Sequence, residues 1–296
     1  MSWSRLLSAI VAIVVALAAI VLGGWYFVAF FGAIVFLGER EYFQLVHAKG
    51  IAPAAKTTYV LSQALLLTAA ISPDLVGVVF PLAGGVICAY LLFQPKLASI
   101  ADISTSILGL FYGGLLPSYW VRLRVELDRI PLPFKQTTLA SHVPIFENWS
   151  PSWLHNIPQG LCLTLLAFSC IWAADIGAYL FGKTFGRTRL SAISPKKTVE
   201  GAVFGIASST AVGIFGAWCL SWPAWLVSGL TVGLAIGLTS LMGDLTESMM
   251  KRDAGVKDSG QLIPGHGGIL DRTDSYVFTA PLVYYFVMLV LPLFVN

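Results

Sequence analysis

The chain has 296 residues, of which 57% are hydrophobic and only 11% are charged, and its mean hydropathy is +0.80. Soluble domains carry about 25% charged residues, so this chain lacks the polar surface that a water-soluble protein of its length needs. The formal net charge of +3 is too small and too dispersed to indicate nucleic-acid binding, whereas acidic phospholipid headgroups are compatible neighbours. The composition therefore predicts an integral membrane protein.

Apolar segments long enough to cross a bilayer recur along the whole sequence. A helical crossing needs about 20 mostly apolar residues, which predicts an all-α, polytopic fold with about nine transmembrane helices. The first segment follows Arg5 and continues directly into the second, so we interpret it as a transmembrane helix rather than a cleaved signal peptide. The predicted segments are 6–23, 25–46, 58–73, 75–93, 103–121, 157–182, 199–220, 224–250 and 268–294.

The sequence divides into two regions that differ in where their charges lie. Residues 1–155 comprise amino-terminal transmembrane helices and a connecting loop, and few ionisable groups fall inside these spans. Residues 156–296 form a carboxyl-terminal region in which charges enter the spans themselves. The loops 183–197 and 251–266 are rich in lysine and arginine, so we expect both to face the cytoplasm, with the protein in the cell's inner (plasma) membrane.

Two polar features of the amino-terminal region have structural explanations. We interpret Glu39, Arg40 and Glu41 as the interfacial end of a helix. Asp102 is interpreted as an acid in the first turn of a helix, where a carboxylate accepts hydrogen bonds from free backbone amides. Neither feature is assigned to a functional site.

The first polar cluster of the carboxyl-terminal region lies between residues 172 and 201. An ionised side chain in hydrocarbon costs at least about 2.5–3.5 kcal/mol, so such residues indicate contact with water, an ion or a substrate. Asp175 falls inside the sixth span, and Lys196, Lys197 and Thr198 immediately precede the seventh. Lysines beside a helix amino terminus can bind phosphate, because cationic side chains and free amides both attract anions. A positive-inside loop explains these lysines about as well.

The second cluster closes the eighth span. Asp244, Glu247, Ser248 and Lys251 share one helical face. A Glu247–Lys251 pair would explain two of these residues as a self-neutralised helix end. It leaves Asp244, which lies deeper in the span, as a predicted functional residue.

The third cluster is the loop and helix that follow. Lys257, Gly267 and Gly268 belong to the loop, where glycines permit a tight backbone path with amides exposed to an anionic ligand. Asp271 and Asp274 are three residues apart in the ninth span and can point the same way. Carboxylate oxygens of this kind suit Mg²⁺, which binds a few carboxylates together with substrate phosphates.

A family resemblance accompanies these clusters. The stretch SMMKRDAGVKDSGQLIPGHGGILDRTD, Ser248 to Asp274, closely resembles the signature of phosphatidate cytidylyltransferases, also called CDP-diacylglycerol synthases. The upstream segments DIGAYLFGK, SPKKTVEG and GDLTES are similar to that family's and occur in the same order. The specific resemblance covers residues 172–274, whereas the amino-terminal half is similar only in hydrophobicity and length.

The resemblance implies transfer of CMP from CTP to phosphatidic acid, which gives CDP-diacylglycerol and pyrophosphate for phospholipid biosynthesis. It implies Mg²⁺, with a second cation as an option, held by Asp244 and Asp271, with Asp274 and Asp175 as weaker candidates. Lys251 and Arg252 join the two aspartates as catalytic residues. The residues expected to bind substrate phosphates are Lys196, Lys197, Thr198, Ser248, Lys257, Gly267, Gly268 and Arg272.

His266 is also placed among the catalytic residues. We favour a hydrogen bond to phosphate or a role in loop geometry over proton transfer, because a phosphate monoester, with a second pKa of about 6, is already largely dianionic near neutral pH. Membrane lipids are expected neighbours, and a homodimer is suggested by analogy with the family.

Two other functions are compatible with parts of this pattern. An enzyme that uses CTP to phosphorylate a lipid alcohol would also need metal and lysines. An ion-coupled transporter would share intramembrane acids and broken helices. The CDP-alcohol phosphotransferases are excluded because their DGxxAR-type signature is absent from the sequence.

Overall fold

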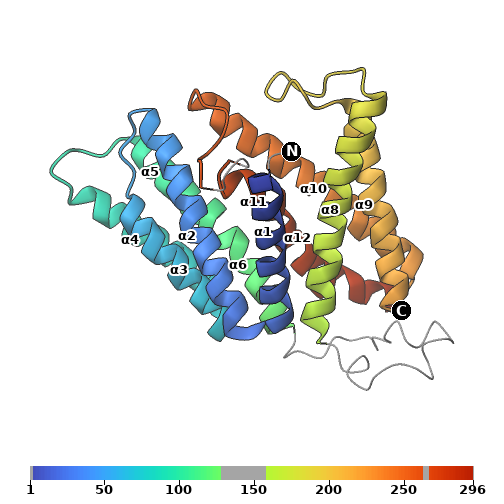
Figure 1. The fold of residues 1–296 in the computed structure, drawn as a ribbon. Helices are drawn as coiled ribbons and strands as arrows, with labels where there is room; N and C mark the ends of the chain where they lie inside the picture. The colour runs from blue at the N-terminus through green and yellow to red at the C-terminus, as the bar shows by residue number, and fades with distance from the viewer. Residues whose placement is uncertain (1–2, 128–157, 263–266, 296) are drawn as a thin grey trace. The chain divides into compact units, whose positions relative to one another are not determined.

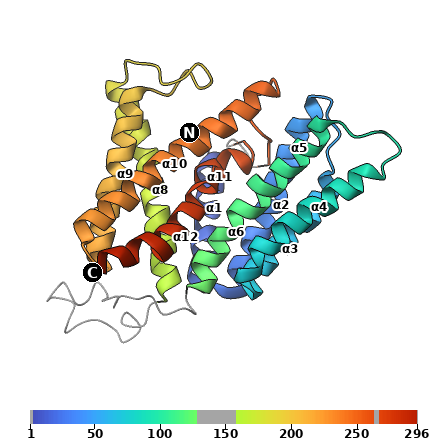
Figure 2. The same ribbon diagram turned by 180° about the vertical axis from the view of Figure 1, so that it is seen from behind.

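The computed structural model describes residues 3–127, 158–262 and 267–295. In these ranges the regular structure is helical apart from isolated bridge positions at Arg189, Thr198 and Gly267, which confirms the all-α prediction. Figures 1 and 2 show the helices from opposite sides. They are α1 (Trp3–Leu22), α2 (Gly24–Ala48), α3 (Ala55–Ile71), α4 (Val76–Leu92), α5 (Ile100–Gly109), α6 (Leu116–Val121), α8 (Gln159–Phe185), α9 (Val199–Cys219), α10 (Trp225–Asp253), α11 (Leu270–Val277) and α12 (Thr279–Tyr285).

Short 3₁₀ and π-helical segments extend several of these helices. They are η1 (Pro73–Leu75), η2 (Leu110–Leu115), η3 (Arg122–Glu126), η6 (Phe286–Val290) and η7 (Leu291–Val295). As a result, α5, η2, α6 and η3 form one continuous helical stretch, and α11 to η7 form another. Both stretches were predicted as single spans, 103–121 and 268–294.

Six helical stretches of the described residues are long and apolar enough to cross a membrane, so the chain is a polytopic membrane protein. They are Pro73–Leu92, Ile100–Glu126, Gln159–Phe185, Val199–Cys219, Trp225–Asp253 and Leu270–Val295. The other three predicted spans also coincide with helices. However, α2 carries Glu39, Arg40 and Glu41, and α3 has only 17 residues. Their membrane crossing, and that of α1, stays a prediction.

The residues form two compact units, each built from two separate pieces of sequence. The first unit contains Met1–Arg122 and Gly243–Val277, and the second contains Leu123–Met242 and Phe278–Asn296. The boundary predicted near residue 155 lies outside the described residues.

Small residues allow close helix packing in the second unit. A Cβ atom on Gly205 of α9 would lie 2.7 Å from the carbonyl oxygen of Ala174 in α8. On the other side of α9, a Cβ on Gly233 of α10 would lie 2.6 Å from the Cα of Thr210. The hydroxyl of Ser209 donates to the carbonyl of Gly233 at 2.8 Å, which adds an interhelical hydrogen bond.

In the first unit, Asp102 caps α5. Ser99 Oγ accepts from the Asp102 amide, and Asp102 Oδ2 accepts from the Ser99 amide at 2.7 Å, which makes a capping box. Asp102 Oδ1 accepts from the Ala52 amide at 2.7 Å and so also ties the segment before α3 to this helix end. The interpretation of Asp102 as a first-turn acid is confirmed.

The interpretation of residues 39–41 as an interfacial helix end is wrong for both glutamates. Glu39 and Glu41 are only 2% and 5% exposed. Glu39 accepts a hydrogen bond from Ser62 of α3, and the π-helical turn of η2 brings Gly113 so close that a Cβ there would collide with the Glu39 side chain. Sequence composition could not reveal these partners, because they come from distant helices.

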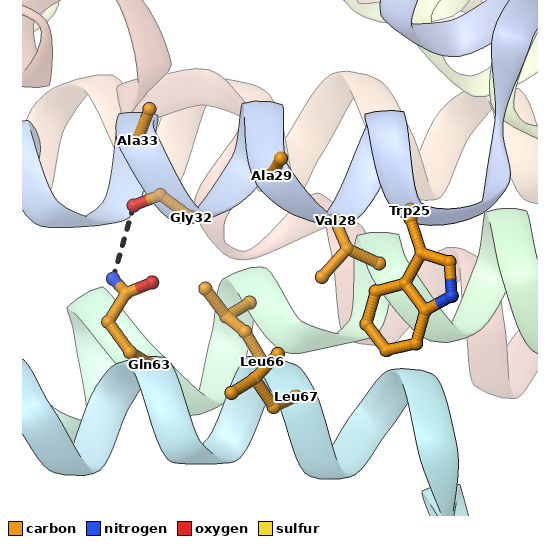
Figure 3. A pocket seen from close by; sticks show the side chains of 8 residues that line it. All are labelled: Trp25, Val28, Ala29, Gly32, Ala33, Gln63, Leu66 and Leu67. Atoms are coloured by element: carbon orange, nitrogen blue, oxygen red, sulfur yellow. Dashed lines mark hydrogen bonds between the residues drawn. The ribbon is translucent and has the colours of Figure 1, made fainter.

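A cavity of about 290 Å³ lies between α2 and α3 (Figure 3). Its only hydrogen-bonding side chain besides Trp25 is Gln63, whose Nε2 donates to the carbonyl of Gly32 at 3.1 Å. None of the predicted site residues lines this cavity, and it offers no charge to a phosphate. The lining residues are Trp25, Val28, Ala29, Gly32, Ala33, Gln63, Leu66 and Leu67.

Candidate active site

Asp271 is the second residue of α11, and its carboxylate accepts hydrogen bonds from the preceding loop. Its Oδ2 accepts hydrogen bonds from the Gly268 amide at 2.8 Å, from the Ser259 amide at 2.9 Å and from the Ser259 hydroxyl at 3.0 Å. A carboxylate in the first turn of a helix is favourable because the amides there have no helical acceptors. Asp271 therefore ties together the two described parts of the site loop, defined here as residues 254–262 and 267–269.

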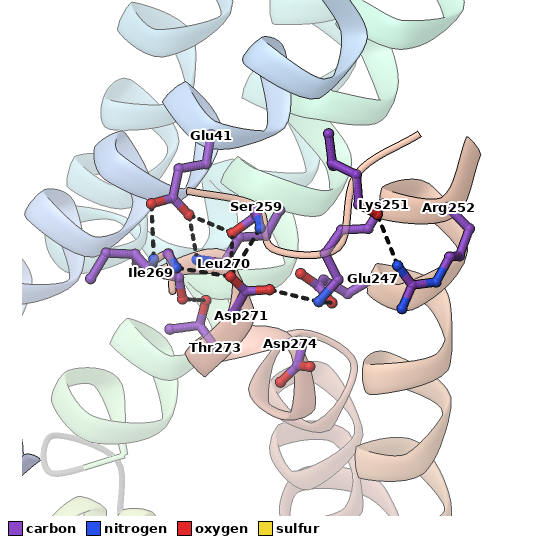
Figure 4. Close-up of polar contacts among 12 residues, drawn as sticks. Glu41, Glu247, Lys251, Arg252, Ser259, Ile269, Leu270, Asp271, Thr273 and Asp274 are labelled. Atoms are coloured by element: carbon purple, nitrogen blue, oxygen red, sulfur yellow. Dashed lines mark hydrogen bonds and ion pairs between the residues drawn. The ribbon is translucent and has the colours of Figure 1, made fainter. Parts of the chain in front are cut away.

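Lys251 joins the end of α10 to Asp271 (Figure 4). Its ammonium nitrogen lies 2.6 Å from Asp271 Oδ1 and 2.5 Å from Glu247 Oε2. The three side chains are only 12%, 9% and 0% exposed for Lys251, Asp271 and Glu247. The predicted Glu247–Lys251 pair is thus confirmed, and the structure extends it to one of the predicted metal ligands.

Carboxylates outnumber ammonium groups in this cluster. One ammonium serves two carboxylates, and a third, that of Glu41, approaches through the Ser259 hydroxyl. Both oxygens of Glu247 are buried, and Oε2 pairs with the Lys251 ammonium. Buried charge without full compensation is costly, so such a cluster either keeps a proton on one carboxylate or binds a further cation.

Asp244 and Asp274 lie in the same unit. A Cβ on Gly243 would collide with the carbonyl oxygen of Asp274, so the backbones of α10 and α11 touch beside Asp244. The acids predicted from the eighth and ninth spans therefore gather in one region, together with Glu247.

The donor chemistry of this region fits Mg²⁺, although a complete ligand set is not assembled. Mg²⁺ prefers oxygen ligands, and the buried Glu247 oxygens with the surplus of carboxylates supply them. Across the residues placed by the structure, no group of three or more His, Cys, Asp or Glu side chains is arranged to hold a metal ion. Asp271 Oδ1 accepts from Lys251 and Oδ2 accepts from the site loop, so a metal ion bound here would share this carboxylate with them.

The predicted residues Ser248, Arg252, Lys257 and Arg272 of the first unit differ in their exposure. Ser248 is buried, whereas Arg252, Lys257 and Arg272 are exposed. Arg252 Nη1 donates to the carbonyl of Val256 at 2.9 Å, which closes the first turn of the site loop.

Two glycines were predicted to offer amides to a phosphate. Gly267 has a φ of +84°, a conformation that favours glycine. The amide of Gly268 donates to Asp271. Phosphate binding by Gly268 would therefore require exchange with that carboxylate. His266 lies outside the described residues.

The other predicted residues belong to the second unit. Thr198 caps α9, its hydroxyl oxygen accepting from the Gly201 amide at 3.1 Å. Lys196 and Asp175 are exposed and Lys197 is half-buried. Their participation in a site with Asp271 stays a prediction.

Glu41 contacts the site loop and was missed by the sequence analysis. Its Oε1 accepts from the Ile269 amide at 3.0 Å, and its Oε2 accepts from the Leu270 amide at 2.9 Å and from the Ser259 hydroxyl at 2.8 Å. The only signal in the sequence was a pair of acids within an apolar helix.

The close contact between Gly243 of α10 and the backbone of Asp274 in α11 predicts that a methyl group added at Gly243 lowers the stability of the protein. We expect Gly243→Ala to destabilise the protein by about 1–3 kcal/mol, because the added carbon meets backbone that cannot move aside. Thermal unfolding in detergent measures this loss of stability. Gly85→Ala in α4 is the matched control, since a Cβ there meets nothing within 4 Å and should leave stability unchanged or raised. Equal melting temperatures for the two variants would contradict the close contact.

The chain was compared with known proteins. A sequence model described as the Cytidylyltransferase family matches residues 3–290. A phosphatidate cytidylyltransferase of Synechocystis sp. is 62% identical over 298 residues, covering 100% of both chains. Phosphatidate cytidylyltransferase 4, chloroplastic, of Arabidopsis thaliana is 43% identical over 279 residues, 92% of this chain and 70% of the relative. The similarity thus includes the amino-terminal half, where the motifs alone gave no specific resemblance.

Proposed function

The chain belongs to the cytidylyltransferase family, and on that premise we propose that it is an enzyme that transfers CMP from CTP to phosphatidic acid, releasing CDP-diacylglycerol and pyrophosphate. The observation that carries this proposal is the full-length similarity to a phosphatidate cytidylyltransferase at 62% identity. The cluster of Glu247, Lys251 and Asp271 at α10 and α11 provides the carboxylates and the positive charge that such a reaction needs. The phospholipid substrate also accounts for a polytopic membrane protein.

The substrates supply the reacting groups. A phosphate oxygen of phosphatidic acid attacks the α-phosphorus of CTP, a new P–O bond forms, and the bond to the bridging oxygen of pyrophosphate breaks. No serine or cysteine nucleophile is needed, so the protein contributes positioning and neutralisation of phosphate charge. Lys251 is suited to that task because its ammonium is already held at the centre of the cluster.

The proposed cofactor is Mg²⁺, with Asp244 and Asp271 as its ligands and with Asp274 and Asp175 as further candidates. A bound Mg²⁺ would neutralise phosphate oxygens of the triphosphate. The buried oxygens of Glu247 and the surplus of carboxylates support a divalent cation here. A second cation is compatible with the same surplus.

We propose phosphate-binding roles for the basic and small residues around the cluster. Arg252, Lys257 and Arg272 are exposed and lie on or beside the site loop, where cationic side chains can meet CTP. The other proposed contacts are Lys196, Lys197, Thr198, Ser248, His266, Gly267 and Gly268.

The proposed topology has nine crossings, the six long apolar stretches together with α1, α2 and α3. The lysine- and arginine-rich loops support a cytoplasmic site, which is also the side from which CTP arrives. The proposed location is the inner (plasma) membrane, and the proposed assembly is a homodimer.

The test is an assay of purified protein with labelled CTP, phosphatidic acid and Mg²⁺. We expect CDP-diacylglycerol and pyrophosphate in equal amounts. A product that is a phospholipid monoester formed from a lipid alcohol would indicate the CTP-dependent kinase instead. Ion-driven flux into vesicles without nucleotide would indicate the transporter. Either result in place of a CDP-lipid would overturn the proposal.

A further inference from the structure

Glu41 connects the amino-terminal helices of the first unit to the start of α11. Its two carboxylate oxygens accept three hydrogen bonds, from the amides of Ile269 and Leu270 and from the hydroxyl of Ser259. Figure 4 shows the carboxylate reaching from α2 onto the turn that leads to Asp271. Glu41 is 5% exposed, so these bonds are shielded from competing water.

The site loop is shaped to receive this carboxylate. A Cβ on Gly260 would lie 2.6 Å from Glu41 Oε1, and a Cβ on Gly268 would collide with Glu41 Oε2 and the Ser259 hydroxyl. Neither glycine has a positive φ, so the space around Glu41, rather than backbone conformation, requires glycine at both positions. Gly260 and Gly268 therefore both lie against the Glu41 carboxylate.

Ser259 links Glu41 to the proposed metal ligand. Its Oγ lies 2.8 Å from Glu41 Oε2 and 3.0 Å from Asp271 Oδ2, so its single proton is shared between the two carboxylates. The Ser259 amide donates to Asp271 as well, at 2.9 Å. A change at Glu41 is therefore transmitted to Asp271 through one residue.

The helix that carries Asp271 needs such an anchor. α11 opens a longer helical stretch that runs to Val295, and the amides of its first turn have no helical acceptors. Its first amides are satisfied by side chains, with Gly268 bonded to Asp271 and with Ile269 and Leu270 bonded to Glu41. Without Glu41, two of these donors would be left without a partner in a buried setting.

We propose that Glu41 is a positioning residue of the active site, whose carboxylate latches the site loop and thereby sets the position of Asp271 relative to Lys251. Glu41 touches neither reacting group and has no step in the reaction. The catalytic part of this inference rests on the proposed function. The hydrogen bonds that form the latch join residues of this chain and do not depend on the proposed function.

The test compares Glu41→Gln with Glu39→Gln in the full chain. Both variants remove a buried carboxylate from α2, but Glu39 bonds to Ser62 and makes no bond to the site loop. We expect Glu41→Gln to lower kcat about 100-fold, because a displacement of about 1 Å in a catalytic group has that effect. The KM for phosphatidic acid should stay within about threefold of the wild-type value, and Glu39→Gln should stay near wild-type kcat.

A second readout does not depend on activity. Lys257 is exposed in the site loop, so trypsin cleavage after this residue, followed by mass spectrometry without substrates, reports on the latch. We expect several-fold faster cleavage in Glu41→Gln and wild-type cleavage in Glu39→Gln. Ser259→Ala should give an intermediate loss of kcat, and adding it to Glu41→Gln should cause little further loss, because both break the same connection.

Wild-type kcat and wild-type cleavage in Glu41→Gln would overturn the latch. Equal losses in Glu41→Gln and Glu39→Gln would also overturn it, because they would indicate a general need for buried acids in α2. If the wild-type protein forms no CDP-lipid, the proposed function fails, whereas the cleavage comparison still decides on the latch.

Discussion

Lys251→Met is expected to lower CDP-diacylglycerol synthesis by at least about 1,000-fold and to destabilise the protein by about 3–5 kcal/mol. The substitution keeps the length of the side chain but removes the ammonium that lies between Glu247 and Asp271. Two buried carboxylates would then face each other without a counter-charge. The proposed triphosphate site would also lose this fixed positive charge. Product formation and thermal unfolding, measured on the same preparation, test both effects.

An exposed ion pair of the same unit provides the control. Lys49 pairs with Asp253 at 3.2 Å, but the two side chains are 42% and 70% exposed, so Lys49→Met should change neither activity nor stability measurably. The double variant Lys251→Met, Glu247→Gln should recover part of the stability and none of the activity. A Lys251→Met protein that is as stable and as active as the wild type would contradict the central position of this ammonium.

Asp244→Asn is expected to abolish turnover while the protein remains folded. The change preserves shape but removes the charge that the proposed Mg²⁺ site needs. We also expect Mg²⁺ to raise the melting temperature of the wild-type protein in the presence of CTP, and this increase to be lost in Asp244→Asn. CDP-diacylglycerol formation and the thermal shift are the two measurements.

Asp253→Asn is the matched control, since Asp253 lies on the same helix and its side chain is 70% exposed. It should retain wild-type turnover and the wild-type thermal shift. If Asp244→Asn turned over CTP at a near-normal rate, the assignment of Asp244 as a metal ligand would fail. A normal thermal shift with no turnover would instead leave metal binding to Asp271 and its neighbours.

The helices could be predicted from the sequence because each one depends on its own residues. A run of apolar side chains must be helical in lipid, since every backbone amide needs a partner within the segment. The predicted segments 199–220 and 224–250 accordingly match α9 (Val199–Cys219) and α10 (Trp225–Asp253) closely. The capping role of Asp102 could be predicted for the same reason, because its main partner, Ser99, is three residues away.

The partners of the site residues could not be predicted in this way. Lys251 and Glu247 are four residues apart and were paired correctly, whereas the contact of Lys251 with Asp271 depends on the path of the site loop. Gly268 was expected to offer its amide to a phosphate, but the carboxylate three residues ahead takes it. The groups that donate hydrogen bonds to the Glu41 carboxylate lie more than two hundred positions away in the sequence, and no local periodicity carries that information.

The discontinuous make-up of the first unit has a consequence for how the protein is made. Residues 1–122 leave the ribosome long before residues 243–277, so α2 is made while the donors that satisfy Glu41 do not yet exist. A buried carboxylate without partners is costly, and therefore the helices of residues 1–122 must stay loosely associated until translation is nearly finished. The arrival of Ser259, Ile269 and Leu270 then completes the packing of these helices and of the site loop together. A nascent chain can thus hold no finished active site with which to consume CTP.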